Sequence, residues 1–137
     1  MRDYESYDAL GLAELVRNRD VTPTELLEAA VSRAEAAQKR VNCFSALYPD
    51  IARRQIAGGL GKGPVAGVPF VLKDLGAPLK GQKLTQGSRL YKDFVATEDA
   101  TLTQRYKVAG FSIFGHTTTP EFGSTTTTES VLFGETR

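Results

Sequence analysis

Residues 65–72 read Val-Ala-Gly-Val-Pro-Phe-Val-Leu, a nearly unbroken apolar run. Such a run is typical of a β-strand buried on both faces, as in a sheet covered by helices. It ends in Lys73 and Asp74, two charged side chains at the tip of the predicted strand. Functional sites of open α/β sheets gather at strand ends, so this position is the first place to look for chemistry.

The first part of the chain is patterned as helices. Asp8 is expected to cap a short helix, and Thr22-Pro23-Thr24-Glu25 forms a capping box that begins a longer amphipathic helix. The β-branched and aromatic residues of 41–48 favour a strand. A short helix over 49–57 and a surface loop over the glycine-rich residues 58–64 follow.

A second helix and strand are expected after the apolar run. Thr97 predicts a helix start and Gly110 a helix end, which gives a helix over about 98–109. Residues 111–115 then form a short buried strand. A strand, a helix and a second strand in this order favour a parallel crossover.

The pattern as a whole predicts an α/β fold in one domain of residues 1–137. A helical arm covers about 1–57, and the α/β core begins at about 64 and runs to 137. Residues 76–87 form a loop, and the threonine-rich stretch 117–128 contains an ordered turn. The two or three strands cannot cover the apolar run by themselves, so the sheet is expected to be incomplete.

Composition excludes several classes of function. Seventeen basic and sixteen acidic residues leave a net charge of +1, so we expect neither nucleic acid nor an anionic membrane as partner. Cys43 is the single cysteine, which fits a small core residue rather than a nucleophile, and with one histidine it makes a zinc cluster unexpected. We expect no metal or other cofactor. With no signal peptide and no apolar stretch of roughly 18 residues, we expect a soluble, cytoplasmic protein of open oligomeric state.

Lys73 has two interpretations from spacing alone. It is either a charge that extends to solvent or pairs with Asp74 or Asp99, or a desolvated lysine that acts as a base or a Schiff-base nucleophile. Burial penalises the ammonium form and so favours the second role.

Four segments in order resemble the amidase-signature family. They are the lysine segment Gly67–Leu75, the stretch Ala109–Gly123 with its Thr-Pro-Glu-Phe motif, the closing residues Phe133–Arg137, and the N-terminal Thr22–Leu26. The resemblance covers nearly the whole chain. It implies the N-terminal part of the amidase-signature fold, a helical arm followed by strands of a mixed sheet covered by helices.

The resemblance also implies a mechanism, because that family contains serine hydrolases with a Ser-cisSer-Lys triad. Lys73 then corresponds to the catalytic lysine, which accepts a proton through a bridging serine and so activates a nucleophilic serine. In the family both serines lie in a Gly/Ser-rich stretch beyond the position of Arg137. The serines in the second half of this chain match none of that motif: Ser88, Ser112, Ser124 and Ser130. We therefore expect residues 1–137 alone to be inactive.

Two positions depart from the family pattern and one is a binding candidate. His116 stands where many members carry lysine or another polar residue, and Thr118 where asparagine is frequent. Ser124 lies in a segment that resembles the lining of the substrate pocket in relatives, although it equally fits a backbone turn.

The leading interpretation is an amidase that acts on a small-molecule amide, and the closing match favours amidases that include hydrolases of cyclic amides. A noncatalytic, partner-binding module and a Schiff-base lysine enzyme remain as alternatives.

Overall fold

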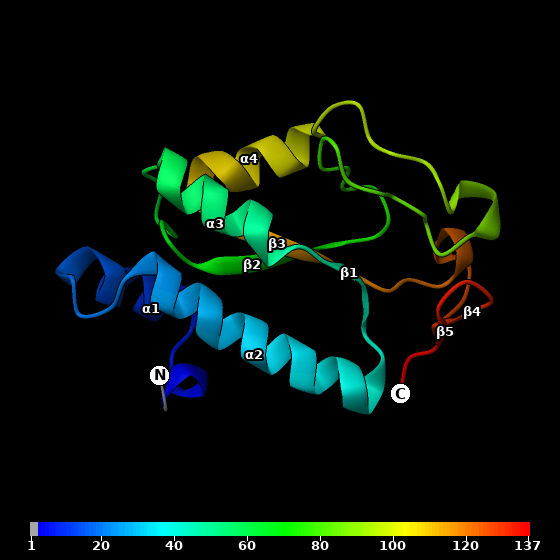
Figure 1. The fold of residues 1–137 in the computed structure, drawn as a ribbon, viewed down its shortest axis with the longest axis horizontal. Coiled ribbons are helices and arrows are strands. Elements are labelled where there is room, and N and C mark those ends of the chain that lie inside the picture. The colour runs from blue at the N-terminus through cyan, green and yellow to red at the C-terminus, as the bar shows by residue number, and fades with distance from the viewer. Residues whose placement is uncertain (1–2) are drawn as a thin grey trace. The chain divides into compact units, whose positions relative to one another are not determined.

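The computed structural model describes residues 3–137, which contain helices and strands in a mixed order (Figure 1). The α-helices are α1 (Ala9–Asn18), α2 (Pro23–Val41), α3 (Pro49–Gly58) and α4 (Thr101–Ala109). The strands are β1 (Phe44–Leu47), β2 (Pro69–Lys73), β3 (Ser112–Thr117), β4 (Glu129–Ser130) and β5 (Gly134–Glu135). Short 3₁₀ helices are η1 (Tyr4–Ser6), η2 (Arg89–Tyr91) and η3 (Glu121–Gly123). The α/β class predicted from the sequence is confirmed.

A mixed three-stranded sheet has the order β1-β3-β2. β1 pairs antiparallel with β3, with Leu47 opposite Gly115. β2 runs parallel to β3, since the amide of Ser112 donates to the carbonyl of Val68 and the amide of Asp74 donates to that of Thr117. The mixed sheet and its parallel step therefore agree with the prediction, and β2 is an edge strand of the described sheet.

The chain folds into two compact units, each made of three stretches. The first comprises the chain up to Ala34, Tyr48–Phe70 and Arg105–Phe114, and the second comprises Glu35–Leu47, Val71–Gln104 and Gly115–Arg137. Buried apolar side chains from α1, α2 and the start of the apolar run form a core cluster in the first unit: Leu12, Ala13, Leu26, Val65 and Val68.

The two N-terminal helices begin at the residues that the sequence predicts. Asp8 accepts a hydrogen bond from the amide of Gly11 at 2.8 Å and caps α1. In the capping box, the Glu25 amide donates to the Thr22 hydroxyl at 3.2 Å, and the Thr22 amide donates to the Glu25 carboxylate at 2.8 Å. These bonds satisfy amide groups that the first helical turn leaves without partners.

Thr22→Ala should therefore lower the free energy of unfolding by about 1 kcal/mol, because one amide at the start of α2 loses its acceptor. Chemical denaturation measures this value. The neighbouring Thr24→Ala is the matched control, since Thr24 is exposed, and it should leave stability unchanged or slightly raised. Equal effects of the two substitutions would contradict the capping assignment.

The apolar run does not form one strand over 65–72, so this prediction is wrong in its extent. Only Pro69–Lys73 is a strand. The residues before it turn, with the amide of Val68 bonded to the carbonyl of Val65 and Gly67 at φ +89°. The apolar character of Val65 and Val68 instead serves the core cluster of the first unit.

Two other element boundaries differ from the sequence prediction. The helix predicted over 98–109 begins at Thr101, because the Asp99 carboxylate accepts a bond from the Lys80 amide and the Ala100 amide donates to Pro78. The strand predicted over 41–48 is limited to Phe44–Leu47.

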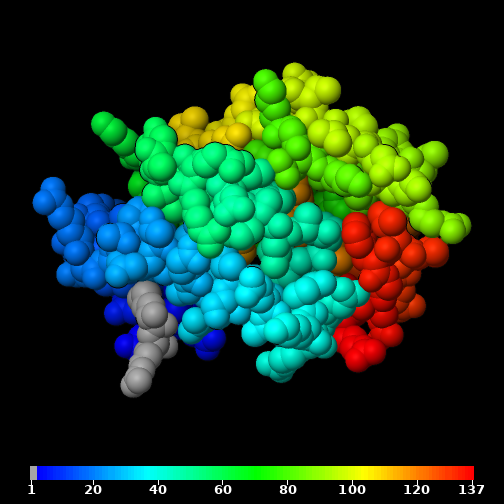
Figure 2. Space-filling view, viewed as in Figure 1, coloured from blue at the N-terminus to red at the C-terminus, as the bar shows by residue number. Residues whose placement is uncertain are grey.

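The second unit holds α2's end and the C-terminal residues together. The Asn42 side chain donates to the carbonyls of Phe133 and Glu135 at 2.8 and 3.1 Å, and the amide of Arg137 donates to Val41. Figure 2 shows the C-terminal residues, in red, on the surface beside the cyan residues at the end of α2. None of the helices described in 3–137 is long and apolar enough to cross a membrane.

Candidate functional site

Lys73 is the last residue of β2 and its side chain is exposed. This exposure agrees with the interpretation of Lys73 as a charge that extends to solvent, and within residues 3–137 the side chain is not desolvated as the alternative interpretation requires. The physical reason is the strand's alternation. Leu72 and Asp74 are 2% and 1% exposed, so Lys73, between them, points to the other face of an edge strand.

The interpretation of Lys73 as an ion-pair partner of Asp74 or Asp99 is not supported. The Asp74 carboxylate accepts from the amide of Thr85 at 2.7 Å and from its hydroxyl at 2.5 Å. The Asp99 carboxylate accepts from the Lys80 amide at 2.8 Å. Within the described part of the chain, Lys73 forms no ion pair.

A hollow of about 360 Å³ lies beside Asp74, on the side of the strand end away from Lys73. Half-buried residues of β1 and the charged residues of the 83–93 segment line it, together with Leu132 and Phe133. Lys83 and Asp93 form an exposed ion pair of 3.2 Å at its edge. The Asp74 carboxylate already accepts two bonds from Thr85, and Lys83 is paired with Asp93. These charged groups of the hollow therefore have structural partners.

His116 on β3 is fully buried, and its Nε2 lies 3.2 Å from the carbonyl oxygen of Ala77. Burial lowers the pKa of His116 from its ordinary value, while the bond to Ala77 and the negative charge of Asp74 oppose this shift. The ring is therefore neutral at pH 7, and with the hydrogen on Nε2 it donates to Ala77. His116, a departure from the family pattern, thus has a structural partner here.

The buried imidazole predicts a stability loss on acidification. Since the pKa of His116 in the folded protein lies below 6.5, the unfolded chain takes up the proton first as the pH falls. Stability present above pH 6.5 is therefore lost as the pH falls through the folded-state pKa. Denaturation from about pH 8 to about pH 5 should show a smaller loss for His116→Gln than for the wild type. Identical pH profiles would contradict this account.

Ser124 lies directly after η3 and is exposed, and its hydroxyl donates to the carbonyl of Glu121 at 2.7 Å. A Cβ built on Gly123 would lie 2.7 Å from the Leu75 side chain, so this turn lies against residues just beyond Lys73. Phe122 holds a left-handed backbone at φ +52°, and its amide donates to the carbonyl of Gln86. Ser124 is therefore near the strand end in the fold, with its hydroxyl engaged in a turn.

The hydroxyls of the other three serines in this half of the chain also have structural partners. Ser88 donates to the Glu121 carboxylate at 2.5 Å, and Ser112 donates to the carbonyl of Val68 at 3.4 Å. The Ser130 hydroxyl accepts from the amide of Phe133 at 3.1 Å. Glu121 is the one carboxylate among these partners, the other bonds are to backbone groups, and no bond described in residues 3–137 joins one of these serines to Lys73.

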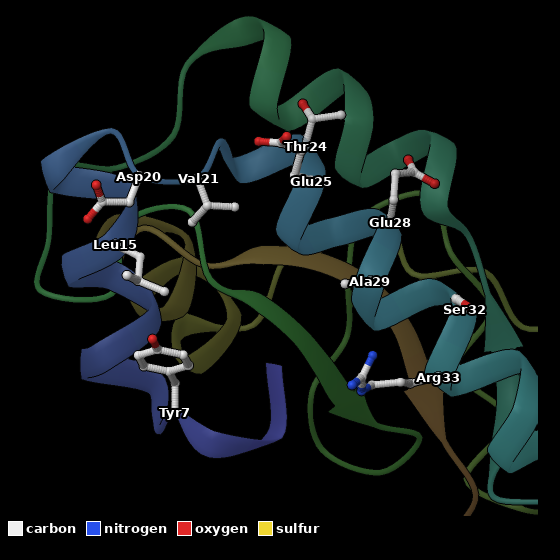
Figure 3. A pocket seen from close by; sticks show the side chains of 10 residues that line it. All are labelled: Tyr7, Leu15, Asp20, Val21, Thr24, Glu25, Glu28, Ala29, Ser32 and Arg33. Carbon is white, nitrogen blue, oxygen red and sulfur yellow. The ribbon is translucent and has the colours of Figure 1, made fainter. Parts of the chain in front are cut away.

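A larger hollow of about 740 Å³ lies on the first unit, between α1 and α2 (Figure 3). Three of the charged side chains that line it are engaged in structural contacts: Glu25 in the capping box, Glu28 with Arg53 at 2.8 Å, and Arg33 with Glu5 at 3.2 Å. This groove contains neither histidine, cysteine nor lysine, so it holds no counterpart of the lysine in the family's triad. Among residues 3–137, no three potential ligands gather around a metal site.

Comparison with known proteins identifies the family. The amidase family model matches residues 25–137. The chain belongs to the amidase family. Over 132 residues it is 39% identical to the 6-aminohexanoate-cyclic-dimer hydrolase of Paenarthrobacter ureafaciens, covering 95% of this chain and 26% of that relative. It is 35% identical to the lipoamidase of Enterococcus faecalis, covering 96% of this chain and 18% of that one.

A solved structure of 6-aminohexanoate cyclic dimer hydrolase shares the fold, with a TM-score of 0.89 and 38% identity. The match covers 96% of this chain and 27% of that one. The chain therefore spans between 18% and 27% of the length of these relatives. The region that the family model matches includes β2, Lys73 and the Thr-Pro-Glu-Phe stretch.

Sequence reasoning did not identify Thr85 as the partner of Asp74, or Glu121 as that of Ser88. Eleven and thirty-three residues separate these pairs, so no local periodicity joins them. The alternation of the strand is the one sequence signal for this contact. It places Asp74 on the same face as the apolar Leu72, which predicts a buried carboxylate that requires hydrogen-bond donors.

Proposed function

We propose that this chain supplies the general-base lysine of an amidase that uses a Ser-cisSer-Lys triad. The observation that carries the proposal is the position of Lys73, an unpaired and exposed lysine at the carboxyl end of a strand parallel to β3. It lies within the region that the amidase family model matches. A side chain there is fixed at its backbone and open to a partner at its amine.

In the proposed mechanism a neutral Lys73 takes a proton from a bridging serine, and that serine takes one from the nucleophilic serine. The nucleophile attacks the amide carbonyl, the C–N bond breaks with protonation of the leaving amine, and water then hydrolyses the acyl-enzyme. Both serines are assigned to residues beyond Arg137. Because burial favours the neutral amine, the proposal requires that those residues cover the exposed Lys73 in the complete protein.

The proposed substrate is a small-molecule amide. The name of one relative, 6-aminohexanoate-cyclic-dimer hydrolase, supports that cyclic amide as the first compound to test. Ser124, in the turn that lies against Leu75, is the proposed substrate-binding residue. We place the activity in the cytoplasm.

The test uses the complete reading frame that contains these residues and the isolated 137-residue chain. The complete protein should carry a Gly/Ser-rich stretch after residue 137 and release amine from amides such as 6-aminohexanoate cyclic dimer. The isolated chain should release none, since both serines of the proposed triad are assigned to residues beyond Arg137. Lys73-dependent hydrolysis by the isolated chain would contradict the proposal, as would an inactive complete protein.

A further inference from the structure

Asp74, which follows Lys73, forms hydrogen bonds through both its backbone and its side chain. The Asp74 amide donates to the carbonyl of Thr117 on β3 at 3.0 Å. Its carboxylate is 1% exposed and accepts two bonds from Thr85, at 2.7 Å from the amide and 2.5 Å from the hydroxyl. One donor faces each carboxylate oxygen, so the buried charge is compensated and its direction is fixed.

Thr85 is itself a rigid partner. It is buried, and its hydroxyl also accepts a bond from the amide of Gly87 at 3.2 Å. Gly87 adopts φ +69°, and a Cβ there would lie 2.5 Å from the carbonyl oxygen of Thr119. The loop therefore approaches its neighbour so closely that only glycine fits, and this close packing presents Thr85 to Asp74 in one place.

Ala77, at the other end of the turn that follows Lys73, also has a hydrogen-bond partner on β3. The Ala77 carbonyl lies 3.2 Å from Nε2 of His116, whose ring is buried on β3. Residues 74–77 are thus held between β3 and the 85–87 loop, although the segment 76–87 contains three glycines and would otherwise be flexible.

We propose that Asp74 and Thr85 are positioning residues for Lys73, an inference that rests on the proposed amidase function. Asp74 faces away from Lys73, so its carboxylate does not take part in the reaction. It sets the backbone from which the lysine side chain extends. A lysine has four rotatable side-chain bonds and ends an edge strand, so its reach to a serine depends on a fixed backbone.

The experiment uses the complete protein and measures kcat and KM separately. Thr85→Val removes the hydroxyl that bonds Asp74 and keeps the side chain's shape. It should lower kcat about 10- to 100-fold, the cost of misplacing a catalytic group by about 1 Å, with KM nearly unchanged. Thr85→Ser keeps the hydroxyl and should retain most of the activity.

Thr103→Val is the matched control. Thr103 is also fully buried in the second unit, and within the described structure its hydroxyl has no hydrogen-bond partner. This variant should keep the wild-type kcat. Asp74→Asn, which keeps the volume of the side chain but only one acceptor oxygen, is the second test and should lower kcat in the same way if Thr85→Val does not fold.

The inference would be overturned if Thr85→Val or Asp74→Asn lowered the melting temperature but kept the wild-type kcat per folded molecule. The pair would then contribute to stability alone. Failure of the proposed function gives a different result. In that case the wild type does not hydrolyse amides or Lys73→Ala retains its rate, and the positioning role is rejected together with it.

Discussion

Lys73→Ala should reduce amide hydrolysis by the complete protein about 10²- to 10⁴-fold, the range that general-base catalysis contributes. The loss should appear in kcat, because the amine acts on the proton in the transition state and adds little to substrate binding. Steady-state kinetics on one hydrolysed amide measures it. The fold should be retained, since the Lys73 side chain is exposed and forms no ion pair among the described residues.

The matched control for this loss is Lys62→Ala. Lys62 is also exposed, in the loop between α3 and β2, and its replacement should leave kcat unchanged. A comparable loss in both variants would indicate an effect of net charge instead of a base. If Lys73→Ala retained the wild-type activity, the proposal that Lys73 is the general base would be contradicted.

Gly110→Ala should destabilise the protein by about 2–5 kcal/mol, the sum of an unfavourable backbone and overpacking. Gly110 ends α4 at φ +102°, which an L side chain rarely adopts, and a Cβ there would lie 2.5 Å from Cα of Ala66 and 2.6 Å from the carbonyl oxygen of Gly61. Both contacts are with backbone atoms, which cannot move aside as a flexible side chain can. The free energy of unfolding from chemical denaturation measures the effect.

Gly58→Ala provides the control in the same unit. Gly58 is the last residue of α3, and no atom lies within 4 Å of a Cβ built there. This substitution should leave stability unchanged or slightly raised, because alanine favours a helix. If Gly110→Ala changed the free energy of unfolding as little as Gly58→Ala, the close packing of residues 61–66 on the end of α4 would be contradicted.

The features that the sequence predicts correctly depend on neighbouring residues. The Thr22–Glu25 capping box, the Asp8 cap and the helix end at Gly110 each involve groups within one or two turns of each other. Local stereochemistry decides such features, so their residue types alone identify them.

The features that the sequence analysis predicts incorrectly depend on distant residues. Asp99 leaves the predicted helix because its carboxylate accepts from Lys80, nineteen residues earlier. The apolar residues Val65 and Val68 serve a core built by the N-terminal helices and not a strand. Composition shows that these residues are buried, but it does not show what covers them.

The candidate site also contains one feature that the sequence identifies and one that only the fold shows. The family resemblance singles out Lys73, and its place at the end of β2 agrees with the predicted strand end. Spacing alone left its exposure open, because an apolar run indicates burial of a strand without showing which residues cover the strand. The Asp74–Thr85 pair is likewise set by the fold, across a loop with no pattern of its own.

The most direct test of the account is covalent labelling of the complete protein with a fluorophosphonate, which reacts with activated serines. Peptide mapping should place the label on a serine beyond residue 137, and Lys73→Ala should slow labelling about 10²-fold or more, as loss of a general base does. Labelling of Ser88, Ser112, Ser124 or Ser130, or a labelling rate independent of Lys73, would contradict the claim that this chain supplies the base of the triad and not its nucleophile.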